Sequence, residues 1–596
     1  WNFGSAAEWQ FGEMRKFIGE NKPLMEACEE VSVRIGGIVG SFFAQIAKKL
    51  NTHEGALETI WCQTARKVLT KSQMEKEERE EWEKLGGTLG YLDLEMQVST
   101  IQIYVRRLKL RMEEIKARLE AVKEKLARQQ LLIKEKKVPV LVVLEGWGTA
   151  GKGYAIGQII QNIDPRFFKV VSMQKKTEDD KRKPFLYRHF AKIPEAGQFV
   201  FLDTAWMDEI TEERLHGTIS EDVYANRIES VRRFERQLTD NGYLVMKFFL
   251  HISKKEQSRR IAQLEHQKDT TWRVSKKDLW QNEHYEKCMD VFSGYLKNTN
   301  MPSAPWYIID AKSRKWTEVQ ILETLTQGIE IALSNHQMAV PLLQNVFPLK
   351  KMPLLCDIPL DKCMEEDVYK KELKQLQQRL GELHNRLYRK KVPVIIAYEG
   401  WDAAGKGGNI KRITGALDPR GYEVHPIASP EPHEKARHYL WRFWTRLPRT
   451  GHIAIFDRTW YGRVMVERLE GFCSENDWMR AYNEINEFEK ELHDWGAVII
   501  KFWVQIDKDT QLARFTDRQN TPEKQWKITE EDWRNRDKWD AYEGAVNEMI
   551  QKTSTTYAPW HILESVDKKY ARIKALWIRC CTKKKILPKK KNKTRC

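Results

Sequence analysis

A glycine-rich loop followed by a lysine occurs twice in the sequence, each time directly after a short apolar run. The later loop reads Gly-Trp-Asp-Ala-Ala-Gly-Lys over residues 400–406, and the earlier one covers residues 146–152. Glycines let backbone N–H groups approach phosphate oxygens, a following helix N-terminus favours negative charge, and the lysine adds a positive point charge. The pattern alone is weak, but two occurrences in the same setting predict phosphate-binding loops.

The residue after the loop lysine is glycine in both copies, Gly407 and Gly153, where many phosphate-binding loops carry the Ser or Thr that holds Mg²⁺. Another hard oxygen ligand must therefore bind the metal. Asp402 lies inside the later loop, and Asp457 ends another apolar run, in the position of a Walker B acid. We expect these two carboxylates to bind Mg²⁺; the alternatives are a turn residue for Asp402 and a helix cap for Asp457.

Basic residues gather around Asp457. Arg458, Arg463 and Arg468 follow it, and arginines beside a phosphate site can stabilise charge that develops during transfer. The stretch 434–449 adds further basic residues interleaved with tryptophans. A solvated helix face explains these equally well, except for Arg442. The predicted phosphate-binding set is Gly400, Ala403, Ala404, Gly405, Gly407, Gly408, Arg442, Arg463 and Arg468.

The two loops belong to an internal duplication with a constant offset of 254 residues. Residues 138–147 recur at 392–401, Asp203 recurs as Asp457, and the Ala-Pro-Trp at 304 recurs at 558. An unchanged offset across such distant landmarks indicates two copies of one domain.

Each copy has the pattern of an α/β domain. A helix with apolar residues three and four apart precedes each loop, and continuous apolar runs suit a parallel sheet buried on both faces. Strands that alternate with helices predict a doubly wound parallel sheet flanked by helices. The predicted helices cover 105–126 and 373–387, and the predicted strands cover 138–144, 392–398, 451–456 and 497–506.

These patterns predict five parts of the chain. Residues 1–100 have no counterpart in the second copy, so we expect an N-terminal helical extension without an assigned role. A first domain follows over 101–335, then a linker over 336–355 and a second domain over 356–580. A basic tail covers 581–596.

The first copy departs from the second where chemistry is expected. Gly148 stands where the second copy has Asp402. Thr204 and Glu209 stand where it has arginines. We therefore predict that the first copy is inactive or weak, although it can still support fold, assembly or polymer binding. Its degenerate loop keeps Gly146, Gly151, Lys152 and Asp203.

Together these residues resemble the polyphosphate kinase 2 family, and more closely its fused two-domain members. The likeness covers roughly residues 105–325 and 365–575 and is most specific in the second copy. The motifs that carry it are E-G-W-D-A-A-G-K-G at 399–407, L-D-P-R-G-Y at 417–422, Y-L-W-R-F-W at 439–444, I-F-D-R-T-W-Y-G-R at 455–463 and A-P-W at 558–560.

The resemblance implies tandem P-loop kinase domains of the thymidylate-kinase type, with a helical lid after the Walker B strand. It implies that inorganic polyphosphate donates a phosphoryl group to AMP, which becomes ADP, with Mg²⁺ as cofactor. By position in the family motifs, the catalytic set is Asp402, Lys406, Asp457 and Arg458.

The net charge of +17 fits a polyanionic partner, but eight of the positive charges lie in Lys583–Cys596. We expect a cytoplasmic homo-oligomer that needs neither membrane nor nucleic acid. Two alternatives stay open: a nucleoside monophosphate kinase that uses ATP, and a non-catalytic nucleic-acid-binding P-loop protein. A donor assay separates the first from the prediction, and a salt-sensitive gel shift tests the second.

Overall fold

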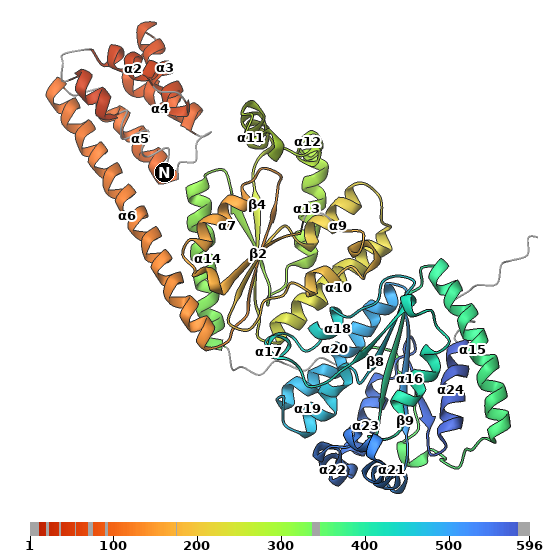
Figure 1. The fold of residues 1–596 in the computed structure, drawn as a ribbon. Coiled ribbons are helices and arrows are strands. Elements are labelled where there is room, and N and C mark those ends of the chain that lie inside the picture. Colours follow the sequence, from red (N-terminus) through yellow and green to blue (C-terminus); the bar gives the residue numbers. More distant parts are fainter. Residues whose placement is uncertain are drawn as a thin grey trace, which may run out of the picture. The chain divides into compact units, whose positions relative to one another are not determined.

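The computed structural model describes most of the chain, and the two compact units it forms are considered separately (Figure 1). No helix among the described residues has the length and apolar character needed to cross a membrane. Most of the predicted basic tail and residues 336–345 of the predicted linker lie outside the described residues. The described residues are 11–18, 23–34, 37–53, 55–69, 76–89, 93–173, 176–335 and 346–581.

The smaller unit is built mainly from helices within residues 1–129. Its core is a set of aromatic rings in edge-to-face contact, and the Trp61 indole N–H donates to the Trp82 carbonyl at 2.8 Å. The predicted boundary at residue 100 falls within one continuous helix, α6. The helices are α2 (Leu24–Arg34), α3 (Gly37–Asn51), α4 (Leu57–Val68), α5 (Lys76–Leu89) and α6 (Leu94–Glu135).

The larger unit contains most of both predicted domains, and each domain is built around a five-stranded sheet. The strand orders, β2-β3-β1-β4-β5 and β10-β9-β6-β8-β7, are equivalent under the 254-residue offset. The first-copy strands are β1 (Val140–Gly146), β2 (Phe168–Ser172), β3 (Phe199–Asp203), β4 (Leu244–His251) and β5 (Trp306–Asp310). The second-copy strands are β6 (Val394–Gly400), β7 (Tyr422–Pro426), β8 (Ile453–Asp457), β9 (Val498–Gln505) and β10 (Trp560–Glu564).

All four strand pairs of the second sheet are parallel, and helices flank both sheets (Figure 1). The predicted duplicated α/β fold is therefore confirmed. The first-copy helices are α7 (Lys152–Ile160), α8 (Tyr187–Phe190), α9 (Trp206–Leu215), α10 (Glu221–Asp240), α11 (Lys254–His266), α12 (Lys276–Glu283), α13 (Tyr285–Thr299) and α14 (Arg314–Asn335). Those of the second copy are α15 (Glu366–Arg389), α16 (Lys406–Thr414), α17 (Pro432–Lys435), α18 (Trp441–Trp444), α19 (Val466–Leu469), α20 (Glu475–Asp494), α21 (Lys508–Asn520), α22 (Glu530–Asp537), α23 (Trp539–Thr553) and α24 (Lys568–Cys581).

The two copies face each other through equivalent surfaces. The Thr450 N–H donates to the Arg182 carbonyl at 2.9 Å, and the Ala196 N–H donates to the Ala436 carbonyl at 2.7 Å. These two bonds are exchanged by the 254-residue offset. Phe190 stacks on its own counterpart, Trp444, with ring centroids 5.1 Å apart. The copies thus pack about a local two-fold axis, as subunits do in an isologous dimer.

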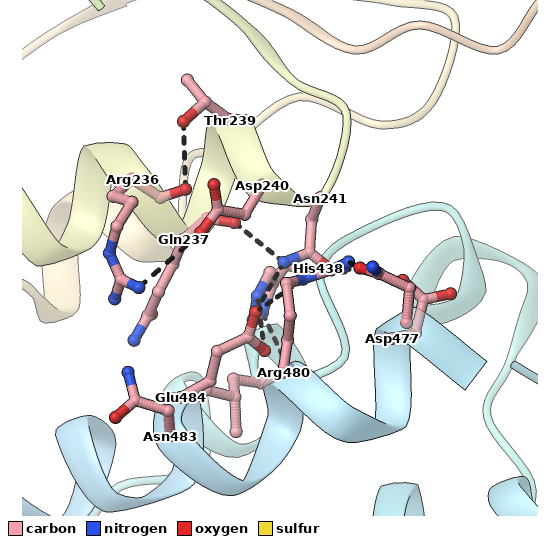
Figure 2. Close-up of polar contacts among 12 residues, drawn as sticks. Arg236, Gln237, Thr239, Asp240, Asn241, His438, Asp477, Arg480, Asn483 and Glu484 are labelled. Atoms are coloured by element: carbon pink, nitrogen blue, oxygen red, sulfur yellow. Dashed lines mark hydrogen bonds and ion pairs between the residues drawn. The ribbon is translucent and has the colours of Figure 1, made fainter. Parts of the chain in front are cut away.

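Polar side chains on α10 and α20 extend this contact (Figure 2). The Asn241 amide donates to Glu484 at 2.9 Å, and the Gln237 amide donates to Glu487 at 2.7 Å. His438 faces the same Glu484 carboxylate at 3.6 Å. Burial alone would raise the pKa of Glu484, but the facing His438, the charge of Arg480 and the Asn241 hydrogen bond lower it to about 2. Both copies therefore supply charge and partners to one polar interface.

A buried ion pair between a strand and a helix recurs in both copies. Lys501 Nζ lies 2.7 Å from Glu489, and the equivalent Lys247 lies 2.6 Å from Glu235; all four side chains are fully buried. The Trp460 indole donates to Glu489 at 3.2 Å, which ties the start of the segment after β8 to this pair. Removing one partner leaves an uncompensated charge in the core.

We predict that Lys501→Met lowers the free energy of unfolding of the second copy by about 3–5 kcal/mol, because Glu489 then stays buried without its cation. A urea titration followed by tryptophan fluorescence measures this. The matched control is Lys490→Met, which removes the partly exposed pair with Asp494 and should cost at most about 1 kcal/mol. Similar losses from both variants would contradict the importance of the buried pair.

Candidate active site

The second loop has a backbone that only glycine permits at two positions. Gly400 has φ 150° and a Cβ there would lie 2.6 Å from the Val504 carbonyl oxygen, while Gly405 has φ 112°. Gly405 directly precedes α16, so the loop turns sharply from β6 into that helix. The first-turn amides of a helix have no acceptor within the helix and are available to an anion.

The carbonyl groups of the second loop are bound from outside it. Arg514 Nη1 donates to the carbonyls of Ala403 and Ala404 at 3.0 and 2.9 Å. The Ser565 hydroxyl also donates to the Ala404 carbonyl, at 2.7 Å. Lys406 Nζ donates to the Gly400 carbonyl at 2.6 Å. With its carbonyls engaged in this way, the loop can direct its amides toward a phosphate group.

An aromatic stack packs against the second loop. The rings of Trp401 and Trp539 stack with centroids 3.7 Å apart and an angle of 7°. The Trp401 indole N–H also donates to Gln505 at 3.0 Å. The first copy has the same support, since Trp147 stacks on Tyr285 at 4.1 Å. The stack therefore belongs to the shared scaffold rather than to the chemistry of one copy.

Strand β8 brings the predicted Walker B segment beside the loop. Tyr398 on β6 is paired with Asp457 on β8, so Asp457 lies at the edge of the sheet from which the loop emerges. The next residue, Arg458, has a left-handed backbone with φ 66°. Thr459 then donates from its N–H and its hydroxyl to Glu399 at 2.7 and 2.8 Å. Burial raises the pKa of Glu399, opposed by Lys406 and by these hydrogen bonds.

Asp402 and Arg458 meet across the loop. Arg458 Nη2 lies 3.3 Å from one oxygen of Asp402, and the Asn535 amide donates to the other at 3.1 Å. Both Asp402 and Arg458 line a pocket with Lys406, so the structure brings these three predicted catalytic residues together. Other residues around this pocket are Glu399, Gly400, Trp401, Gly462, Met465, Val466, Trp503, Gln511, Glu531, Asn535 and Tyr542.

The predicted metal ligands, Asp402 and Asp457, supply hard carboxylate oxygens. Among the described residues no group of three or more His, Cys, Asp or Glu side chains could hold a metal ion. Two carboxylates suit Mg²⁺, which usually keeps several waters and substrate phosphate oxygens in its shell. The donor set therefore fits a cation whose remaining ligands come from solvent and substrate.

Three predicted phosphate-binding arginines are paired with carboxylates. Arg442 lies 3.3 Å from Glu434, Arg463 lies 2.8 Å from Glu467, and Arg468 lies 2.6 Å from Glu548. Other basic residues of the stretch 434–449 contact the first copy instead. For example, Arg437 forms an ion pair with Glu195 at 2.8 Å.

Several residues of the site carried no signal that we recognised in the sequence. Asn535 orients Asp402, Arg514 and Ser565 hold the loop carbonyls, and Trp539 supports Trp401. All of them lie more than a hundred residues beyond the loop, and none belongs to a phosphate-binding motif. The repeat offset offered one signal, because Arg514 corresponds to Arg260 in the first copy.

The first loop keeps the conformation of the second. Gly146 and Gly151 have φ 132° and 100°, and Lys152 Nζ donates to the Gly146 carbonyl at 3.2 Å. Arg260 donates to the carbonyls of Thr149 and Ala150 at 3.1 and 2.8 Å, as Arg514 does in the second copy. The first copy therefore keeps the structure of the loop although it lacks the predicted catalytic groups.

Helix α12 contacts the first loop. The Gly148 N–H donates to Gln281 at 3.0 Å, and a Cβ at Gly148 would lie 1.9 Å from an oxygen of Asp278. Lys277 reaches across to Asp208 at 2.7 Å and also pairs with Glu212. A side chain at position 148 would therefore require the Asp278 side chain to move.

The ion pairs of Lys277 line a pocket of the first copy that is equivalent in position to the pocket of the second copy. Lys277 and its two partners correspond to Glu531, Gly462 and Val466, which all line the pocket beside Asp402. Glu209, which replaces Arg463, pairs with Lys176 at 2.6 Å. The first copy has therefore gained its own ion pairs as well as lost the predicted catalytic groups.

Two family models match the chain. The model described as polyphosphate kinase 2 (PPK2) matches residues 109–337 and again residues 363–591. A model described as stage III sporulation protein AB matches residues 18–131, within the helical N-terminal region and α6.

Known proteins resemble the chain along most of its length. A polyphosphate:AMP phosphotransferase of Pseudomonas aeruginosa is 39% identical over 452 residues, which is 75% of this chain and 90% of the relative. One of Acinetobacter johnsonii is 38% identical over 443 residues, covering 73% and 89%. A crystal structure described as a polyphosphate kinase 2 from Pseudomonas aeruginosa PA01 aligns with a TM-score of 0.68 at 35% identity, covering 79% of this chain and 97% of that one. The two matched segments make up more than half of the chain, which therefore belongs to the polyphosphate kinase 2 family and carries the family's domain twice.

Proposed function

We propose that this chain transfers a phosphoryl group from inorganic polyphosphate to AMP, giving ADP, and that the second copy performs the transfer. One observation carries the assignment to the second copy: Asp402 and Arg458 form a pair beside Lys406 in an open pocket. In the first copy Gly148 and Thr204 stand in place of that pair, and the equivalent pocket is lined by Lys277 and its carboxylate partners instead. The relatives named polyphosphate:AMP phosphotransferase support the choice of donor and acceptor.

The residues of the second copy divide the work of phosphoryl transfer, which depends mainly on positioning and charge stabilisation. The loop amides and Lys406 bind the phosphate being transferred. Arg458 supplies a second cation where negative charge develops. Asn535 fixes the orientation of Asp402. Asp402 and Asp457 would hold Mg²⁺, which neutralises charge on the donor oxygens when bound.

Polyphosphate should serve as phosphoryl donor far better than ATP. Purified full-length protein is given AMP and Mg²⁺ with either donor alone, and ADP formation is followed by chromatography. ADP formation with polyphosphate alone supports the proposal. If ATP were the effective donor and polyphosphate were inert, the protein would be an ordinary nucleoside monophosphate kinase and the proposed donor would be wrong.

Lys406→Ala should lower kcat/KM by about a hundredfold or more, because it removes a charge directed at the transferring phosphate. Its equivalent in the first copy, Lys152→Ala, is the matched control and should change the rate less than about threefold, since we place no chemistry there. Both variants are assayed with polyphosphate and AMP after circular dichroism has confirmed folding. Equal losses would refute the division of roles between the copies.

Asp402→Asn should reduce activity steeply and shift the Mg²⁺ requirement upward, because an amide binds a hard cation more weakly than a carboxylate. The rate is measured across a Mg²⁺ titration, and saturating Mg²⁺ should restore it only in part. Asn535→Ala serves as a comparison, since it loosens Asp402 without removing the charge and should cause a smaller shift. A wild-type Mg²⁺ profile for Asp402→Asn would mean that this carboxylate only shapes the turn.

A further inference from the structure

The contact between the two copies is unequal at its two ends. At one end the Tyr243 hydroxyl of the first copy accepts the His438 backbone N–H of the second at 3.0 Å, and both residues are buried. The 254-residue offset exchanges this pair for Ala497 and Pro184. Alanine has no hydroxyl and proline has no N–H, so the equivalent hydrogen bond cannot form at the other end. This bond therefore breaks the local two-fold symmetry of the contact.

Figure 2 shows a second polar contact at the same end. The Glu484 carboxylate accepts from the Asn241 amide of the first copy at 2.9 Å and lies 3.6 Å from the His438 ring. The offset exchanges Asn241 for Trp495 and Glu484 for Ser230, so neither the amide nor the carboxylate is repeated at the other end. Both contacts therefore act on the part of the second copy around His438.

A short series of contacts leads from His438 to the pocket of the second copy. The rings of His438 and Tyr439 stack with centroids 4.9 Å apart. The guanidinium carbon of Arg463 lies 4.5 Å from the centre of the Tyr439 ring. Arg463 follows Gly462, which lines the pocket that also contains the predicted catalytic residues. The contacts of the first copy are thus two residues away from a predicted phosphate-binding arginine.

The first copy fixes the equivalent segment with its own charges. Phe185 and Glu209 stand where the second copy has Tyr439 and Arg463. Glu209 pairs with Lys176 at 2.6 Å, and both residues belong to the first copy. The series of contacts from one copy to the other therefore runs in one direction, toward the copy to which we assign phosphoryl transfer.

We propose that Tyr243 of the first copy is a positioning residue for the second: through His438 and Tyr439 it holds Arg463 in place beside the phosphate site. This inference rests on the proposed function and gives the first copy a part in the reaction without chemistry of its own. A buried N–H that loses its acceptor is unfavourable, so without the Tyr243 hydroxyl the backbone at His438 shifts and Tyr439 moves with it. Small displacements of this kind matter in a site that depends on placement.

The first test uses Tyr243→Phe, which keeps the ring and removes only the hydroxyl. In the full-length protein it should lower kcat/KM for polyphosphate and AMP by about three- to tenfold, as expected for one lost hydrogen bond. The matched control is Tyr285→Phe, which removes a buried hydroxyl that donates to the Ile252 carbonyl at 2.8 Å within the first copy. The control should change the rate less than about twofold. A rate for Tyr243→Phe equal to that of the wild type or of the control would overturn the inference.

A double-mutant cycle separates positioning from a general loss of stability. If Tyr243 acts through Arg463, Tyr243→Phe should lower kcat/KM in the wild-type background and have no further effect in Arg463→Ala. Losses that multiply independently in the double variant would overturn the inference, because Tyr243 would then act by another route.

Hydrogen exchange followed by mass spectrometry gives a readout that does not depend on activity. Tyr243→Phe should speed amide exchange in residues 437–447 and 458–466, whereas Tyr285→Phe should leave both segments unchanged. Unchanged exchange in 458–466 would overturn the inference even if activity fell. Wild-type protein that showed this exchange difference but did not phosphorylate AMP would instead refute the proposed function and leave the link between the copies standing.

Discussion

The conformation of the second loop depends on side chains from other elements that engage its carbonyl groups. A tight turn exposes both N–H and C=O groups, and carbonyl oxygens facing the ligand would repel it. In the second copy Arg514, Ser565 and Lys406 take up these carbonyls, and the Trp401–Trp539 stack fixes the plane of the turn. Each of these groups comes from an element that the parallel sheet must first bring into place. The conformation of the loop therefore depends on the sheet and on the helices that flank it.

The first copy keeps the same scaffold around a loop to which we assign no chemistry. It keeps the glycine backbone, the holding arginine, the aromatic stack and the buried Lys–Glu pair. Its pocket is lined by the ion pairs of Lys277, and the surface that joins it to the second copy is a local two-fold contact. The retained features hold the loop and the core, whereas the changed ones stand at positions predicted to carry the chemistry. The two copies thus differ mainly at the predicted site and agree in the scaffold that surrounds it.

Much of this could be predicted from the sequence, because repeats, apolar runs and glycine-rich loops are local signals. The duplicated α/β fold was predicted correctly, and strands β1 and β6 begin within two residues of their predicted starts. The partners of individual charges could not be predicted, because an arginine's sequence position does not fix which carboxylate it meets. Arg442, Arg463 and Arg468 pair with glutamates, and Arg437 contacts the first copy. The contact of α12 with Gly148 likewise depends on tertiary packing and has no local signal in the sequence.

The central claim is that one of two structurally equivalent loops binds the donor. Titration calorimetry of the full-length protein with a methylene-bridged triphosphate, which cannot transfer its phosphate, measures this directly through the stoichiometry. We expect one molecule bound per chain, with binding abolished in Lys406→Ala and retained in Lys152→Ala. Two equivalent sites per chain, or loss of binding in Lys152→Ala, would contradict the account.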